Sequence, residues 1–136
     1  MKKQEIALII LRLYLALTMI VHGAARIYAG GVAPFGNFLD GVGFPFGLYL
    51  AWAITIFELV GGLTLITGYF VPVLALVFAF ELLMGIILVH APNGWFVVGL
   101  GRNGMEYSVL LIVAFICVAI SGYGKNSSDR ISAGRK

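Results

Sequence analysis

Charged residues are scarce in this chain. They make up 11% of its 136 residues, while 61% of the residues are hydrophobic. Soluble domains usually contain about 25% charged residues, so the composition excludes a soluble globular domain and an intrinsically disordered one. The length suits a single domain. We therefore expect an integral membrane protein.

Cysteine is nearly absent, because Cys117 is the only one. A single cysteine excludes any mechanism that needs an internal dithiol, such as that of the quinone reductases that cycle a cysteine pair. Cys117 lies in an apolar run, where a free thiol usually packs as a small hydrophobic side chain. We expect it to be buried and structural.

Convincing motifs for nucleotide or nucleic-acid binding are also missing. The segment Gly99–Gly104 fits the bare Gly-x-Gly-x-x-Gly string, but it follows no βαβ unit and lies between apolar segments, so it is interpreted as a loop. The net charge is +3, and most basic residues lie near the two chain ends: Lys2, Lys3, Lys125, Arg130, Arg135 and Lys136. This pattern is typical of cytoplasmic termini. We expect the lipid bilayer, not nucleic acid, as the partner.

Four segments are apolar enough to cross a bilayer, which takes about 20 residues per helix. They are Glu5–Ala24, Gly47–Thr67, Pro72–Val89 and Met105–Ser121. The sequence thus predicts an all-α integral membrane domain over residues 1–124, a four-transmembrane-helix bundle with both termini in the cytoplasm. Residues 125–136 are expected to form a polar cytoplasmic tail.

The predicted connections carry their own signals. Gly68 and Pro72 are typical of a helix end and a helix start, so a short cytoplasmic turn is expected between them. Two longer segments are expected outside: Ala25–Phe46 and His90–Gly104. In the first, Pro34–Asp40 has apolar residues at helical spacing and predicts a short helix that ends at Gly41. In the second, Trp95 and Phe96 are typical of interfacial anchors.

Three charged residues lie inside the predicted spans, namely Arg12, Glu58 and Glu81. A charge at the bilayer centre costs about 2.5–3.5 kcal/mol on insertion scales, so all three are expected to face inward. A rise of about 1.5 Å per residue places them near one level of the membrane, where Arg12 can pair with a carboxylate. Two acids meet one base there, so we expect one carboxyl to be protonated and available for proton-coupled chemistry. A polar clamp that fixes helix packing is an equally good interpretation.

Glycines follow both glutamates at the same spacing. Glu58 precedes Gly62 and Glu81 precedes Gly85, in each case by four residues. A glycine one turn away lets a neighbouring helix approach closely. We expect such close approaches at both glycines, although the two helices run antiparallel and the similarity is not taken as a repeat.

A second polar group is predicted at the outer ends of the spans: His22, Arg26, His90, Arg102 and Glu106. His22 and Arg26 are four residues apart and share one helix face. We expect this group to bind an anionic or carbonyl-bearing ligand. Converging rings of His22 and His90 would suit a metal or a haem, but no ligand spacing supports that interpretation, and no metal site is predicted.

Several of these segments carry a family resemblance: Leu11-Arg12-Leu13, His22–Arg26, Gly43-Phe44-Pro45, Phe57–Gly62 with Gly68, Glu106-Tyr107, and Gly122-Tyr123-Gly124. With them the chain resembles the DoxX family of small bacterial and archaeal membrane proteins over nearly its whole length. Phe57–Gly62 is the most specific segment. The chain departs from the family at Arg26, where lysine is common, and at Ser127-Ser128-Asp129, where many members have Ser-Leu-Asp.

The resemblance implies a four-helix bundle in a bacterial or archaeal plasma membrane and a link to quinones. Some relatives are tied to thiosulfate:quinone oxidoreductase, and others to catechol or quinone handling. The family pattern implies a site at these positions: Arg12, His22, Arg26, Glu58 and Glu106.

We therefore expect a membrane component of a quinone-linked redox system with a quinone as its cofactor. A redox partner protein is expected as well, because the chain has no flavin motif and no dithiol. Two alternatives stay open: a non-catalytic anchor or assembly subunit for a redox partner, and a small proton-coupled carrier that uses Arg12, Glu58 and Glu81. Catalytic turnover and homo-oligomer formation also stay open.

Overall fold

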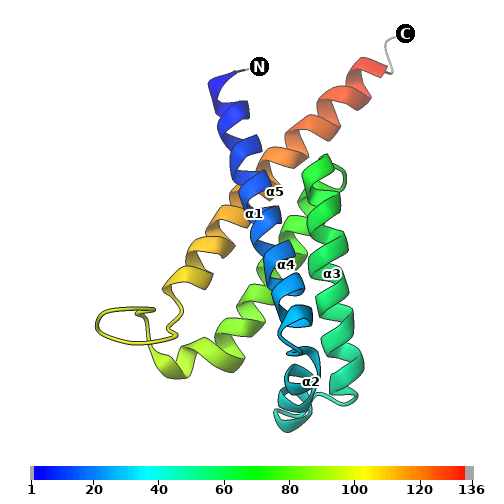
Figure 1. Cartoon of the computed structure of the whole chain (residues 1–136). Helices are drawn as coiled ribbons and strands as arrows, with labels where there is room; N and C mark the ends of the chain where they lie inside the picture. Colours follow the sequence, from blue (N-terminus) through cyan, green and yellow to red (C-terminus); the bar gives the residue numbers. More distant parts are fainter. Residues whose placement is uncertain (1, 134–136) are drawn as a thin grey trace. The chain divides into compact units, whose positions relative to one another are not determined.

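The computed structural model describes residues 2–133, with side chains described through residue 122. Its elements are α1 (Lys3–Tyr28), α2 (Val32–Gly41), α3 (Gly47–Thr67), α4 (Val71–Gly85), η1 (Ile86–His90), η2 (Ala91–Asn93) and α5 (Glu106–Ala133) (Figure 1). No strand occurs within residues 2–133. The all-helical class predicted from the sequence is confirmed for this part of the chain.

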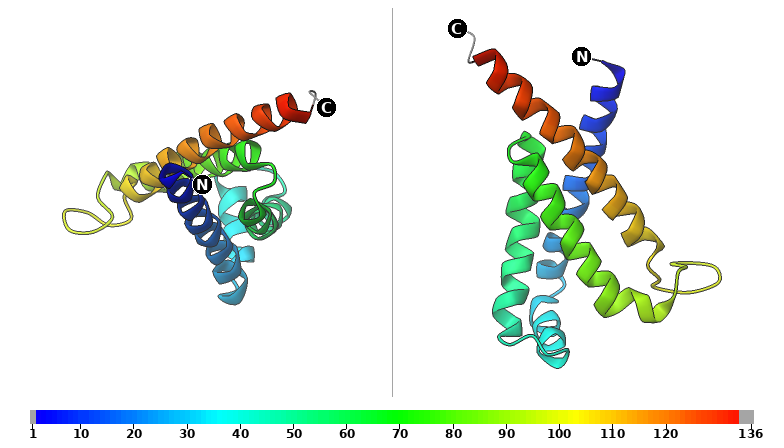
Figure 2. Two further views of the ribbon diagram at one scale, coloured as in Figure 1. Left: turned by 90° about the horizontal axis from the view of Figure 1, so that it is seen from above. Right: turned by 180° about the vertical axis from the view of Figure 1, so that it is seen from behind.

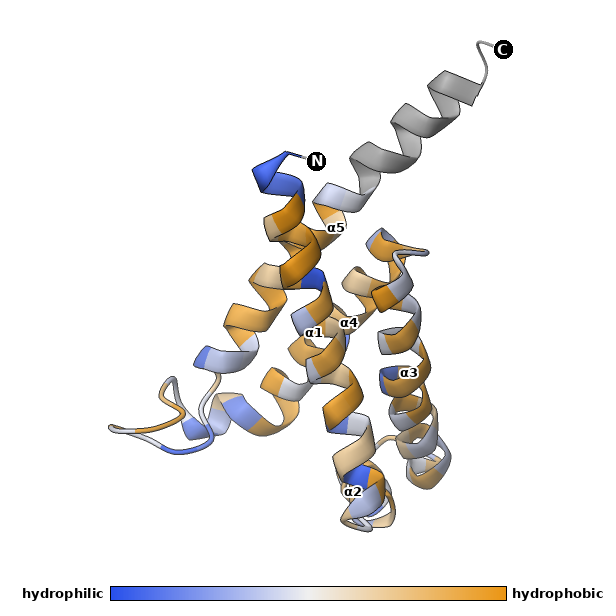
Figure 3. Ribbon diagram, turned by 45° about the horizontal axis from the view of Figure 1, so that its top comes forward, coloured by the Kyte–Doolittle hydropathy of each residue, from blue (hydrophilic) through white to orange (hydrophobic). Residues whose placement is uncertain are grey.

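Three helical stretches are long and apolar enough to cross a membrane, namely Lys3–Tyr28, Gly47–Thr67 and Val71–Asn93. The last of them joins α4, η1 and η2. A shorter apolar helix covers Glu106–Gly122. Hydrophobic residues predominate in the described helices (Figure 3), which is typical of helices that face lipid as well as protein.

Glycine and proline set the boundaries between α3 and α4. Gly68 follows α3 with a φ of 86°, and its N–H bonds to the Leu65 carbonyl. Glycine takes this left-handed conformation without strain. Pro72 lies in the first turn of α4, where its missing N–H costs no helical hydrogen bond. The turn predicted at this place is confirmed.

The chain divides into two compact units, and each is described by itself. The unit Leu13–Tyr69 holds most of α1 together with α2 and α3. In it, α1 and α3 run antiparallel, because Gly23 lies against Glu58 while Ile20 lies against Gly62. A Cβ atom added to Gly62 would lie 2.6 Å from Cγ1 of Ile20. The close approach predicted at Gly62 is therefore present.

Helix α2 packs against the first turns of α3. A Cβ atom on Gly47 would lie 2.2 Å from the Gly36 carbonyl oxygen, so two backbones meet at these glycines. Asp40 Oδ1 accepts the Gly47 N–H at 2.8 Å and so caps α3, whose preceding residue Phe46 makes no side-chain cap. Val32 and Leu39 are buried on the α3 side of α2. The short helix predicted in this segment is confirmed.

The second unit contains Met1–Arg12 and Phe70–Lys136, and its described core lies between α4 and α5. The rings of Phe78 and Phe115 stack there with centroids 5.4 Å apart, and both side chains are fully buried. Further along α5, Gly122 lies against Pro72.

At the end of α4 the α-helix continues as one wider, π-helical turn. Residues Ile86–His90 form this turn, and the Ala91 N–H bonds to the Ile86 carbonyl. Single π-helical turns are often found at functional sites. The turn leads through η2 into a loop, residues 94–105, which projects to one side of the adjoining helix ends (Figure 2).

Two expectations are wrong. Cys117 is exposed, because it lies about 200° around α5 from the buried Phe115. Gly85 has no described atom within 4 Å of an added Cβ, so no helix approaches closely there. In addition, α5 continues as a helix to Ala133, past the end of the predicted span at Ser121. Residues 134–136 of the predicted tail lie outside the described residues.

Candidate functional site

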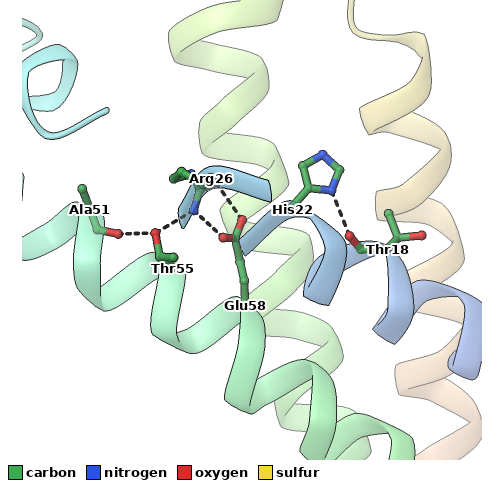
Figure 4. Close-up of polar contacts among 6 residues, drawn as sticks. All are labelled: Thr18, His22, Arg26, Ala51, Thr55 and Glu58. Atoms are coloured by element: carbon green, nitrogen blue, oxygen red, sulfur yellow. Dashed lines mark hydrogen bonds and ion pairs between the residues drawn. The ribbon is translucent and has the colours of Figure 1, made fainter. Parts of the chain in front are cut away.

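An ion pair between α1 and α3 forms the centre of the candidate site. Arg26 donates from Nη1 to Glu58 Oε2 and from Nη2 to Glu58 Oε1, the second bond measuring 2.9 Å (Figure 4). The Glu58 side chain is 2% exposed and that of Arg26 is 20% exposed. A two-pronged arginine–carboxylate pair combines charge with fixed geometry. The pair therefore holds a buried carboxylate in one orientation.

A hydroxyl group extends the pair along α3. Arg26 Nη1 donates to Thr55 Oγ1 at 2.9 Å, and Thr55 Oγ1 donates to the Ala51 carbonyl at 2.7 Å. Thr55 is fully buried and lies three residues before Glu58, so the two side chains share a helix face. The hydroxyl thus accepts a hydrogen bond from the arginine and donates one to the backbone.

Helix α2 covers the arginine from another side. The Arg26 guanidinium lies over the Phe35 ring, 4.7 Å from its centroid. A cation over an aromatic face is stabilised by about 0.5–2 kcal/mol, depending on its solvation. Side chains from α1, α2 and α3 therefore meet at Arg26.

The guanidinium retains hydrogen-bonding capacity. Arginine has five N–H groups, of which three donate to Glu58 and Thr55. The others have no protein acceptor within the part of the chain that the structure describes. With one-fifth of the side chain exposed, they can bind an oxygen atom of a ligand.

His22 lies one turn before Arg26 on α1. Its Nδ1 is 2.9 Å from the Thr18 carbonyl oxygen, which can only accept, so Nδ1 carries the hydrogen. In the neutral ring, Nε2 is then an acceptor. The ring is exposed and turns away from Glu58 (Figure 4), so His22 offers a lone pair at the surface of the helix.

The two other charges predicted at the same level, Arg12 and Glu81, belong to the second compact unit. That unit is formed by Met1–Arg12 and Phe70–Lys136, whereas Glu58 lies in the other unit. The side chains of Arg12 and Glu81 are half-buried. The carboxylate of Glu58 is bonded by Arg26, a residue that the sequence had grouped with the outer polar side chains.

The remaining predicted residues organise the loop 94–105. His90 Nδ1 donates to the Asn103 carbonyl at 2.9 Å, and Glu106 Oε1 accepts the Val97 N–H at 3.0 Å. Arg102 is exposed. These residues are gathered at one loop, and two of them hold its backbone. Within the described residues, no group of three or more His, Cys, Asp or Glu side chains is placed to hold a metal ion.

Two contributors to the site were missed from the sequence. Thr55 has a usable signal, because it lies one helical turn from an acid inside an apolar span. Phe35 was assigned to the short helix alone, since nothing in its spacing indicates a cationic neighbour.

The fold and the site define a multi-pass helical membrane protein with an arginine–glutamate pair between its first two long helices. A family model described as DoxX matches residues 7–91. The match covers well over half of the chain, and the chain belongs to the DoxX family. It includes Arg12, His22, Arg26, Glu58, Glu81 and His90, whereas Arg102 and Glu106 lie beyond it. No curated protein and no solved structure is significantly similar to this chain.

Proposed function

We propose that this protein is the membrane component of a quinone-linked redox system, with its head-group site beside Arg26. The observation that carries the proposal is the partly exposed Arg26, held by a buried carboxylate, with the His22 acceptor one turn away. The proposed setting is the plasma membrane of a bacterium or an archaeon, crossed four times.

The donors and acceptors at the site fit the oxygen atoms of such a head group. A bound quinone supplies two-electron, two-proton chemistry. The free N–H groups of Arg26 donate to a carbonyl oxygen, and His22 Nε2 accepts a hydroxyl hydrogen. Both side chains lie on a helix that faces lipid, which is the phase where quinones dissolve. Glu58 is proposed to orient Arg26 rather than to exchange protons directly, because both of its oxygens accept hydrogen bonds from that arginine.

The redox partner is part of this proposal. Thiosulfate, tied to some relatives, is one donor to test. With one cysteine and no flavin motif, the chain needs a partner to carry electrons. Glu81 is proposed to exchange protons, with Arg12 as a fixed positive charge, and substitution of each residue tests that role separately.

Quinone binding to the purified protein tests the proposal. We expect quinone to be recovered from the protein in mild detergent or to bind when added. The His22→Ala variant should bind about tenfold more weakly, which is the loss of one hydrogen bond. Thr18→Ala is the matched control, because it keeps the carbonyl that holds His22. If the wild-type protein binds no quinone, the proposal is wrong.

A second candidate is a non-catalytic anchor or assembly subunit. It is favoured by the geometry of the ion pair, in which Arg26 binds both oxygens of the buried Glu58. Removing one partner of a buried pair costs about 3–5 kcal/mol, whereas replacing both with apolar groups is often neutral.

The double variant Arg26→Met, Glu58→Leu separates the two candidates. Under either candidate it should be more stable than each single variant in thermal unfolding followed by circular dichroism. Under the redox proposal, it should also bind quinone more weakly than wild type. A double variant that binds quinone as well as wild type would assign the pair to packing alone.

A further inference from the structure

The loop of residues 94–105 exposes apolar side chains. Trp95 is 48% exposed and Phe96 is 41% exposed, while Val98 and Leu100 at the tip reach 76% and 88%. Apolar surface of this kind is unfavourable in water, because burial of each square ångström contributes about 25 cal/mol. We therefore expect either lipid or a protein partner to cover the loop.

The base of the loop is closed by hydrogen bonds. Backbone bonds join Met105 N–H to the Gly94 carbonyl at 3.0 Å, Glu106 N–H to that of Trp95 at 3.0 Å, and Gly104 N–H to that of Phe96 at 3.1 Å. A Cβ atom on Gly104 would lie 2.4 Å from the Phe96 oxygen, so glycine is needed there. The side chains of His90 and Glu106 add the two bonds described above. The base of the loop is thus closed, and the loop projects to one side of the adjoining helix ends (Figure 2).

The loop connects the ends of two apolar helical stretches. It begins where the candidate span ends at Asn93 and finishes where the apolar helix begins at Glu106. From this placement we infer that the loop docks on the lipid surface, with its tip in the boundary between head groups and acyl chains. Val98 and Leu100 enter the apolar side, and the exposed Arg102 meets lipid phosphates.

Composition and size favour lipid over a protein partner. Tryptophan and arginine both combine an apolar body with a polar end, which suits them to the interface. A stable protein interface takes about 20–30 residues from each side, more than this short loop can supply. The loop also lies beyond the family match, which covers residues 7–91.

Tryptophan fluorescence in vesicles tests the inference. The chain has two tryptophans, so Trp52→Phe leaves Trp95 as the only reporter. The protein is reconstituted in phosphatidylcholine vesicles, with bromine placed either near the head groups or near the chain ends. We expect Trp95 to be quenched more strongly by the shallow bromine, and to be poorly quenched by iodide in the aqueous phase.

A pair of variants at the tip completes the test. Leu100→Glu should reduce the shallow quenching of Trp95, while Leu100→Met should preserve it. Both should keep the wild-type unfolding temperature, because Leu100 is exposed. Strong quenching by iodide would mean that the loop lies in water, where a protein partner could bind it, and would overturn the inference. Protection from both bromine and iodide would mean that the loop folds onto the protein and would overturn it as well.

Discussion

At the scale of the residue, Gly62 and Gly85 follow intramembrane glutamates at one spacing but meet different surroundings. Gly62→Ala places a methyl group 2.6 Å from Ile20 Cγ1 and 3.1 Å from the Ala16 oxygen. Such overpacking should cost about 1–3 kcal/mol. Gly85→Ala meets open space among the described residues and should be neutral or gain up to about 1 kcal/mol from helix propensity. Unfolding of both variants in detergent measures the difference, and equal effects would contradict it.

The sequence predicts the depth of a buried charge in the membrane, but it does not identify the residue with which that charge pairs. Hydropathy places Glu58 in the middle of a span, and the cost of a charge in lipid predicts that it needs a counter-ion. It does not select between Arg12 and Arg26, because that choice depends on how far α1 extends and on which face meets α3. Helix α1 continues to Tyr28, four residues past the expected end, and this extension brings Arg26 onto the helix face that meets Glu58.

At the scale of the element, α3 depends on a cap from outside its own sequence neighbourhood. Asp40 accepts the Gly47 N–H, which the helix itself leaves without a partner. Asp40→Ala should lower the free energy of unfolding by about 0.5–2 kcal/mol, and Asp40→Asn should lose less because an amide oxygen can still accept. Thermal unfolding of the two variants checks the order. An alanine variant as stable as the asparagine variant would show that the cap contributes nothing.

The predictable elements are those marked by local chemistry. Gly68 and Pro72 bound the turn between α3 and α4, and apolar spacing marks α2, because these signals act within a few residues. The π-helix at Ile86–His90 and the Asp40 cap were not predicted. The cap joins Asp40 of α2 to Gly47 of α3. Because the chain reverses direction between these two helices, the sequence spacing of the two residues does not indicate that they meet.

At the scale of the whole molecule, charge at the chain ends predicts the direction of insertion. Basic residues near the termini should hold both ends in the cytoplasm, so the turn between α3 and α4 should lie there too. In a Cys117→Ser background, Tyr69→Cys in this turn should resist a membrane-impermeant maleimide in intact cells, whereas Asn37→Cys on α2 should react.

Lysis of the cells supplies the control, because both cysteines should then react. Both replaced side chains are exposed, so neither change should disturb packing. Labelling of Tyr69→Cys in intact cells, with Asn37→Cys protected, would show that the protein has the opposite orientation in the membrane. Labelling at both positions would rule out an odd number of crossings between them.

The break between α1 and α2 adjoins the ion pair. Gly30 has a φ of 66°, and the Gly31 N–H bonds to the Arg26 carbonyl at 2.8 Å, while Phe35 beyond them covers the guanidinium. One wall around Arg26 is therefore a ten-residue helix joined to α1 by a glycine pair, rather than part of a long helix. Substitutions within that short helix can alter the size and polarity around the arginine while the hydrogen bonds of α1 and α3 stay intact. Exchanging this segment alone can therefore change which molecule reaches the charge pair, while the pair itself is kept.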